Sequence, residues 1–361
     1  MSRLTTWIRS WRTRPEPVVD DEPVVLRLPP TRQHERVHTD WASIRNASTP
    51  EYPELAVSRE RGVDGGSPPI FITARFRTGS TMLWNILRHV PELTTYYEPL
   101  HPALQWPLNE RPNYVDPTHD DVSEYWSEYD RIPDLASYYN EPWHNTDLYL
   151  DASHWKPNLA RYMQLLISSA QHRAALQFNR VDFRLAWLRQ MFPAAQLVHL
   201  FRHPRDQWLS VLRNPAEFGP DGTAEEFMKR DYFFMVEWVH DLSAQFPVLD
   251  WDRVQCPYTM HYLLWKLSYL WGRAYSDLSV SYEQLLSAPH ETLSDLFDLL
   301  GIDQRVIPTV MPLIHSKARG KWRQYADAEW FAKHESHAES LLDNLLGQDL
   351  KPHFTARLRA A

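Results

Sequence analysis

The sequence predicts an α/β fold with a central, mainly parallel sheet flanked by helices. Two observations lead to this prediction. From Pro69 onward, short apolar runs alternate with stretches of helical periodicity, an order typical of parallel strands joined by crossover helices. In addition, the 361 residues are 43% hydrophobic, which is enough to bury the core of one large domain with insertions.

The first predicted strand, "PPIFITA", leads into a turn and a helix, the order found in P-loop-like proteins. Apolar residues recur at helical spacing from Met82 to Val90, and Pro91 should end this helix. Two more apolar strands are expected at residues 173–178 and 195–201, with the helical stretch "FRLAWLRQMFP" between them.

A fourth strand is expected in "LSVSY", residues 278–282. The following "PHETLSDLFDLLG" has a proline at its start, an apolar stripe and Gly301 at its end, as helices often do. We therefore assign residues 69–325 to the α/β domain and residues 326–361 to a C-terminal helical extension.

Two stretches depart from the alternation, and we interpret them as helical insertions that cover one end of the sheet. Residues 102–151 are acidic and rich in tyrosine and tryptophan, and residues 224–275 contain two long predicted helices, at 224–246 and 258–275. The aromatic residues of the first insertion either form a wall for a flat acceptor, with acids that recognise a basic one, or pack a lid onto the core. Packing is the more ordinary use of such residues.

Residues 1–68 mix prolines and charges with little periodicity, and we predict a partly ordered N-terminal arm. Residues 3–14 fit a short basic helix, which would either make weak peripheral membrane contact or dock on its own domain. No stretch has the length and apolar character of a membrane span or signal peptide, so we expect a soluble cytoplasmic protein.

Charge and cysteine content exclude several classes of partner. A formal net charge of −8 argues against a nucleic-acid partner, which would require a positive surface. Cys256 is the only cysteine, so an internal disulfide and a zinc–cysteine cluster are excluded. The 17 histidines are scattered without metal-ligand spacing, and we expect no metal.

The turn after the first strand is interpreted as an anion site. Such a turn points backbone N–H groups at one spot, and the start of the helix adds partial positive charge there. In a Walker P-loop a lysine follows the second glycine. Here that glycine is Gly79 and the lysine position is Ser80, so a nucleoside triphosphate would lose its main cationic contact.

Arg77 supplies positive charge in place of that lysine. Hydroxyl groups stand beside it on Thr78, Ser80 and Thr81. A guanidinium next to free amides suits a single phosphate group. Strand-turn-helix junctions of this composition also occur without any ligand, and that alternative remains open for the segment taken alone.

A second basic site is predicted after the strand at 195–201. Arg202 stands at its carboxyl end, the edge where ligands bind in open α/β folds, and Ser210 follows eight residues later on the next helix. Both side chains would then reach one anion. In the alternative, Arg202 and Arg205 simply pair with acids on the surface.

Together these motifs resemble those of sulfotransferases that use 3′-phosphoadenosine 5′-phosphosulfate (PAPS). "RTGST" is similar to the family's 5′-phosphosulfate loop, and "FRHPRDQWLS" to its 3′-phosphate motif. "VSYEQLLSAP" and "KARGKWRQY" resemble two later family motifs. The resemblance runs in the family's order over residues 69–325 and leaves the arm and both insertions uncovered.

The resemblance implies that PAPS is the co-substrate and that residues 77–81 hold its 5′-phosphosulfate. It further implies that Arg202 and Ser210 hold the 3′-phosphate and that Tyr282 lies against the adenine. The residues implied to close over the nucleotide are Lys317, Gly320, Lys321 and Trp322.

The resemblance also implies that Glu98, about twenty residues past Arg77, removes the acceptor's proton, while Arg77 assists catalysis. In the alternative, Glu98 forms a salt bridge to one of the arginines, and His101 or another histidine is the base.

The expected reaction is in-line transfer of a sulfuryl group to a hydroxyl or amine, with release of 3′-phosphoadenosine 5′-phosphate (PAP). The acceptor would be a small molecule, a carbohydrate or a peptide. Two rival functions are a P-loop kinase using ATP and magnesium, which would be expected to have the loop lysine, and a non-catalytic nucleotide-binding relative. The presence of both Arg77 and Glu98 favours an active enzyme.

Overall fold

The computed structural model describes residues 67–111, 119, 122–132, 134–315 and 320–349. The predicted arm at 1–68 lies almost wholly outside these residues, as does Lys317.

Five parallel strands form a single sheet in the order β2-β3-β1-β4-β5 within this part of the chain. The parallel α/β fold predicted from the sequence is therefore confirmed. β1 lies at the centre, with β3 on one side and β4 on the other, so the strand order reverses there. The strands are β1 (Ile70–Ala74), β2 (Leu93–Tyr97), β3 (Arg173–Phe178), β4 (Gln196–Phe201) and β5 (Leu278–Ser281).

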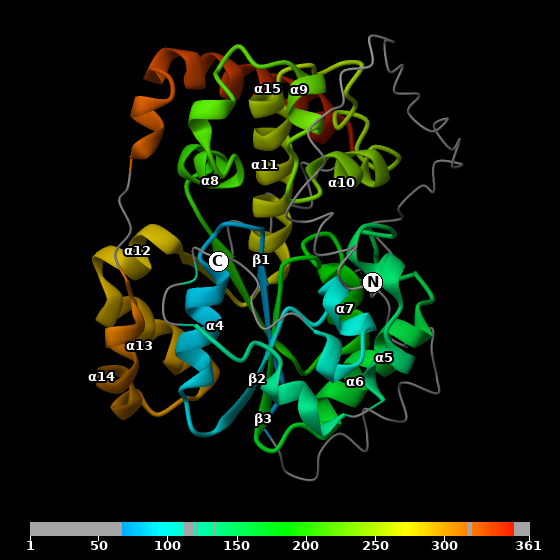
Figure 1. Ribbon diagram of the computed structural model, residues 1–361, viewed down its shortest axis with the longest axis vertical. Coiled ribbons are helices and arrows are strands. Elements are labelled where there is room, and N and C mark those ends of the chain that lie inside the picture. Colours follow the sequence, from blue (N-terminus) through cyan, green and yellow to red (C-terminus); the bar gives the residue numbers. More distant parts are fainter. Residues whose placement is uncertain (1–66, 112–118, 120–121, 133, 316–319, 350–361) are drawn as a thin grey trace.

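Successive side chains of the central strands enter two different cores, because neighbouring residues of a strand point to opposite faces. Ile70, Ile72 and Ala74 pack into one core, whereas Phe71 packs into the other. Helices cover both faces, which explains the continuous apolar runs of the strands (Figure 1). On the first face lie α4 (Ser80–Arg88), α12 (Tyr282–Ser287), α13 (Pro289–Leu300) and α14 (Ile307–Val310); on the second lie α6 (Pro157–Ser169), α7 (Leu185–Met191) and α11 (Pro257–Tyr275).

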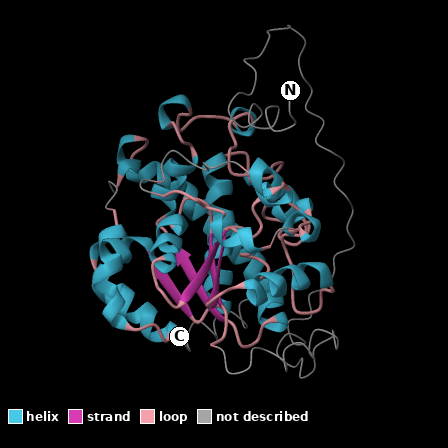
Figure 2. Cartoon of the chain, turned by 60° about the horizontal axis from the view of Figure 1, so that its bottom comes forward, coloured by secondary structure: helices cyan, strands magenta, loops and turns pink. Residues whose placement is uncertain are grey.

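A further group of helices lies beyond the carboxyl edge of the sheet, at the top of Figure 1. The upper half of α11 belongs to it, and α15 packs along α11. When the molecule is turned, helices surround the strands on several sides (Figure 2). The members of this group besides α11 are α8 (Pro204–Val211), α9 (Ala224–Met228), α10 (Met235–Leu242) and α15 (Ala328–Asp349).

The single helix predicted at 224–246 is wrong: the segment forms α9 and α10 with a turn between them. The side chain of Asp231 accepts hydrogen bonds from the backbone N–H groups of Phe233 (3.0 Å) and Val236 (2.7 Å). Phe234 adopts a left-handed conformation with φ of 59°. Side-chain hydrogen bonds of this kind compete with the helical ladder, and here they start α10 anew.

The helical segments within the expected insertion at 102–151 are short. Its described part contains one α-helix, the four-residue α5 (Leu135–Tyr138), and otherwise short 3₁₀ turns at Pro102–Gln105, Leu108–Glu110, Ser127–Arg131 and Glu141–His144. Buried aromatic side chains, rather than helix length, order this segment.

Among the described helices, none is long and apolar enough to cross a membrane.

Candidate active site

One cavity opens at the carboxyl edge of the sheet, and the segment after each of the five strands contributes a side chain to it. The segment after β1 contributes Arg77, and the segments after β2 and β4 contribute Glu98 and Arg202. β3 is followed by Arg180, and β5 by Tyr282. Including its opening to solvent, the cavity measures about 1110 Å³. Its position at the reversal of strand order is where open α/β sheets bind ligands.

The turn between β1 and α4 needs a left-handed backbone at two positions. Arg77 has φ of 67° and Gly79 has φ of 90°. A Cβ atom on Gly79 would stand 2.4 Å from the ring of Tyr282, so only glycine fits there. α4 begins at Ser80, and its first residues line the cavity, so the start of this helix has the place that an anion site requires.

The hydroxyl groups of this turn do not all face the cavity. Ser80 and Thr81 line it. Thr78 is buried instead, and its Oγ1 donates a hydrogen bond to the carbonyl of Arg75 at 2.7 Å. Thr78 therefore shapes the turn with its side chain and has only its backbone N–H left for a ligand.

The two motifs that the sequence analysis identified separately meet in the structure. Nε of Arg77 donates a hydrogen bond to Oγ of Ser210 at 2.9 Å, although the two residues are 133 positions apart. Nη1 of Arg202 donates to the carbonyl of Arg77 at 3.0 Å, and its guanidinium lies 4.8 Å from the ring centre of Tyr282. Nε of Arg202 is buried, with no hydrogen-bond partner among the described residues. A donor in that state fits an anionic ligand.

A buried ion pair supports the turn from behind. Arg75 lies 3.4 Å from the carboxylate of Asp182, which also accepts hydrogen bonds from Thr73 and Ser268, each at 2.9 Å. Burial raises the pKa of Asp182, and Arg75 acts against that rise. Thr73 lies in β1 and Arg75 directly after it, whereas Asp182 lies between β3 and α7 and Ser268 in α11, so the network fixes the turn to the rest of the sheet edge.

Glu98 follows β2 directly and has a strained backbone. Its φ of 37° lies in the left-handed region, which costs a non-glycine residue on the order of 1–3 kcal/mol. The side chain is only 5% exposed, yet it lines the cavity. Strain of this size in a cavity-lining carboxylate residue is typical of functional sites.

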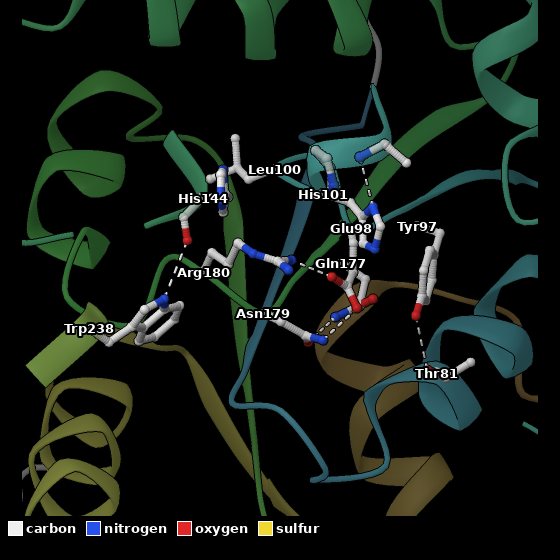
Figure 3. A network of polar contacts seen from close by, with 12 residues as sticks. Thr81, Tyr97, Glu98, Leu100, His101, His144, Gln177, Asn179, Arg180 and Trp238 are labelled. Atoms are coloured by element: carbon white, nitrogen blue, oxygen red, sulfur yellow. Dashed lines mark hydrogen bonds and ion pairs between the residues drawn. The ribbon is translucent and has the colours of Figure 1, made fainter. Parts of the chain in front are cut away.

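The Glu98 carboxylate is held by two residues that follow β3 (Figure 3). Nδ2 of Asn179 donates to its Oε1 at 2.6 Å, and Nη1 of Arg180 donates to its Oε2 in a buried ion pair. The Asn179 side-chain carbonyl in turn accepts a hydrogen bond from Nε2 of Gln177 at 2.7 Å. Both oxygens of Glu98 are thus oriented by a chain of fixed side chains.

This arrangement bears on the alternative considered for Glu98. A salt bridge to an arginine is present, but the partner is Arg180 and not Arg77 or Arg202. Asn179 and Arg180 were missed by the sequence analysis. The signal for them was present, because "NR" directly follows the predicted strand at 173–178, just as Arg202 follows the strand at 195–201.

His101 lines the cavity near Glu98 and is buried (Figure 3). Burial, together with the positive charge of Arg180, keeps the pKa of His101 well below its usual range, so the ring is neutral at pH 7. Its Nδ1 accepts a hydrogen bond from the backbone N–H of Ala103 at 3.1 Å. In a neutral ring the proton must then be on Nε2, which leaves His101 as a donor toward the cavity.

His119 comes from the aromatic insertion and contacts the first turn of α4. Its Nε2 lies 3.1 Å from Oγ1 of Thr81, and its Nδ1 lies 3.0 Å from the hydroxyl of Tyr125. The insertion therefore contributes to the cavity wall beside the anion turn.

Three of the residues expected to close over the nucleotide lie outside the cavity wall. The backbone N–H of Gly320 donates to both carboxylate oxygens of Asp206, at 3.0 and 3.1 Å. Lys321 is exposed. Trp322 packs near Arg205 and Phe331. They dock on the start of α8, just past Arg202. Arg205 itself forms a bidentate pair with Glu335 at 2.7 Å, so the surface-pairing alternative holds for Arg205.

The charge of the cavity is positive on balance. Arg77, Arg180, Arg202 and Arg213 line it, whereas Glu98 is the only acid among the described lining residues. A cavity with this lining is suited to an anion, and Glu98 is the one carboxylate of the described lining that could take part in proton transfer. Within the described residues no three histidine, cysteine or acidic side chains stand close enough together to hold a metal ion.

Comparisons with known proteins point to a single family. A sequence profile described as the Sulfotransferase family matches residues 68–306. No curated protein sequence gives a significant match.

Among similar solved structures is the sulfotransferase domain of an olefin synthase from Synechococcus PCC 7002, with 18% identity, 80% of this chain and 98% of that domain covered, and a TM-score of 0.35. Sulfotransferase STF9 from Mycobacterium avium has 13% identity, with 85% and 80% covered and a TM-score of 0.42. Mouse sulfotransferase SULT7A1, solved in complex with PAP, has 12% identity, with 86% and 94% covered and a TM-score of 0.35. At such distances the site must be judged from its own geometry.

Proposed function

Because the chain belongs to the sulfotransferase family, we propose that it moves the sulfuryl group of PAPS to a hydroxyl or amine of an acceptor and releases PAP. As a member of that family it is an enzyme, a transferase of sulfur-containing groups. The observation that carries the choice of donor is the contact of Arg77 with Ser210 beside Arg202 in one cavity.

The cavity fits a nucleotide with two separate anionic groups. In our proposal, Arg77 and the N–H groups at the start of α4 hold the 5′-phosphosulfate, while Arg202 and Ser210 hold the 3′-phosphate. The buried Nε of Arg202, unpartnered among the described residues, supports this assignment. The ring of Tyr282, which packs against Gly79 and lines the cavity, supports a place for the adenine base nearby.

Glu98 is the group best placed to take the acceptor's proton. The acceptor O–H bond breaks as the new S–O bond forms, and the proton moves to a carboxylate oxygen of Glu98 while the bond from sulfur to the leaving phosphate breaks. Preorganised donors at Arg77 and α4 stabilise the charge that builds on the leaving phosphate. Bound PAPS would supply an activated sulfuryl group with a good leaving group.

His101 is the weaker candidate for the base. Its Nδ1 is already an acceptor for Ala103, and the proton that remains on Nε2 makes the ring a donor. In this role His101 would orient an acceptor oxygen rather than deprotonate it.

The acceptor side of the cavity favours a ligand without positive charge. Aromatic rings line it, from Phe76, Phe233 and Phe234. The side chain of Arg213, which also lines the cavity, is exposed. Because Glu98 is already paired with Arg180, no acid among the described lining residues is left for a cationic group. A neutral or anionic small acceptor with a flat part is therefore proposed.

Ligand-induced stabilisation tests the donor. Thermal unfolding is followed with PAP, with ATP and magnesium, and with AMP, since a ligand of the native state raises its stability by mass action. PAP should raise the midpoint most. Arg202→Ala should reduce that shift, whereas Arg305→Ala, an exposed arginine paired with Asp303, should not. The largest shift with ATP would support the kinase alternative, and no shift with PAP would contradict the proposal.

A further inference from the structure

Glu98 is the first residue of a tight turn, and its own backbone conformation is strained. The backbone N–H of His101 donates to the carbonyl of Glu98 at 2.8 Å, which closes a β-turn with Pro99 at its second position. With φ of 37°, Glu98 itself is in the left-handed region. Such a conformation persists only where the surroundings fix it.

Tyrosine hydroxyls bind the main chain on both sides of Glu98. Each donates to a different backbone carbonyl of the turn or of Tyr97 just before it, and all three contacts are buried. With the His101 bond, every carbonyl from residue 97 to residue 100 therefore has a donor. The three hydrogen bonds run from Tyr129 to Tyr97 O (2.7 Å), from Tyr162 to Pro99 O (2.6 Å) and from Tyr139 to Leu100 O (3.0 Å).

The three tyrosines form a fixed group. Tyr129 and Tyr162 are fully buried and Tyr139 nearly so, and the rings of Tyr139 and Tyr162 meet edge to face with centres 5.9 Å apart. Burial raises the pKa of Tyr129 and of Tyr162 well above the usual range, so both phenols keep the proton that they donate.

We propose that Tyr129, Tyr139 and Tyr162 are positioning residues, which hold the Glu98 turn in its strained form and so aim the Glu98 carboxylate into the cavity. The inference rests on the proposed function, because Glu98 has a catalytic role only there. It also assigns a task to the aromatic insertion, which supplies Tyr129 and Tyr139, while α6 supplies Tyr162.

The chain offers a matched control in Tyr96. Its hydroxyl is buried without a hydrogen-bond partner among the described residues, and its ring lies 5.0 Å from that of Tyr129. Tyr96→Phe removes the same atom from the same neighbourhood but breaks no contact to the turn. It therefore separates loss of a positioning bond from loss of a buried hydroxyl.

The first measurement is amide hydrogen exchange of the full-length protein, followed by mass spectrometry. We compare the wild type with Tyr129→Phe, Tyr139→Phe, Tyr162→Phe, the triple variant and Tyr96→Phe. Each positioning variant should speed exchange in peptides that cover residues 98–101, and the triple variant should do so most. Tyr96→Phe should leave exchange there unchanged. Equal exchange in the triple variant and the wild type would overturn the proposal.

The second measurement is PAP release from PAPS with water as acceptor, which requires no identified acceptor. The triple variant should lower kcat on the order of tenfold to 10²-fold and leave the KM for PAPS nearly unchanged. Tyr96→Phe should match the wild type. The positioning role would be overturned if the triple variant showed faster exchange but an undiminished kcat, provided that Glu98→Gln lowers kcat in the same assay.

The two measurements distinguish a failure of the positioning proposal from a failure of the proposed function. If the wild type releases no PAP, or if Glu98→Gln has no effect on the rate, the proposed base or donor is wrong. The exchange result would still decide whether the tyrosines hold the turn.

Discussion

Glu98 combines a strained backbone, a buried side chain and two fixed donors at the carboxyl end of β2. Asn179 donates to one oxygen of the carboxylate and Arg180 to the other, and a carboxylate has further lone pairs that can accept a proton. A carboxylate held in this way can accept a proton from a ligand at a defined place.

Glu98→Gln should leave PAP binding near that of the wild type and lower turnover by about 10²-fold or more, because the amide cannot take a proton at neutral pH. Turnover is measured as PAP release and binding as the PAP-induced rise of the thermal midpoint. An unchanged rate would remove Glu98 from the base role. A lost PAP shift would instead indicate that the variant disturbs the nucleotide site.

Single residues show how far the sequence could predict the site. Arg77 and Arg202 were predicted because each follows an apolar strand within a motif, and the structure brings them together. Arg180 follows a strand in the same way but belongs to no motif, so only the three-dimensional contact with Glu98 marks it. The orientation of the Thr78 hydroxyl away from the cavity depends on the turn geometry, which residue type does not specify.

Elements were predictable where burial dictates the pattern. β1, β3 and β4 are short apolar runs and were predicted from that feature, and β5, in which leucine and valine alternate with serine, was predicted as well. β2 was missed, because "LTTYY" contains two threonines, shows no alternation and forms an edge of the sheet. α6 was missed as well, although it supplies Tyr162. The break between α9 and α10 depends on Asp231, whose capping contacts are not visible in periodicity.

Asp231 makes α10 sensitive to pH. Burial raises its pKa from 3.8 to about 6, so the folded protein holds this proton more tightly than the unfolded chain. The associated stability is present below about pH 4 and is lost as pH rises through about 6. The rise of the pKa from 3.8 to about 6 corresponds to about 3 kcal/mol of folding free energy.

The stability of Asp231→Asn relative to the wild type should therefore increase as the pH is raised from 4 to 7, because the amide does not ionise. The midpoints of urea unfolding of both proteins at the two pH values measure this gain. Asp221→Asn, at an exposed aspartate, serves as the control and should show no such trend. A constant difference between Asp231→Asn and wild type would contradict the predicted linkage.

At the scale of the whole molecule, a positive cavity is set in a chain with a net charge of −8. The arginines would attract an anionic nucleotide over short distances, while the net charge would repel it over longer ones. Added salt screens both the attraction and the repulsion. The net result of added salt therefore tells which effect dominates binding.

We expect the Kd of PAP to rise several-fold when sodium chloride is raised from about 0.05 M to about 0.5 M, because the direct arginine contacts outweigh the distant repulsion. Calorimetric titration at several salt concentrations measures it. AMP, with fewer charges, should show a smaller change. Tighter PAP binding at high salt would mean that long-range repulsion prevails.

The convergence of all five strand ends on one cavity also links this site to folding. Its lining residues run from Phe76 to His315, so the site is complete only when the whole sheet has assembled. Any partial unfolding that detaches one strand therefore removes the lining residues that follow that strand. A bound ligand should therefore suppress each of these openings to a similar extent and make unfolding more nearly all-or-none.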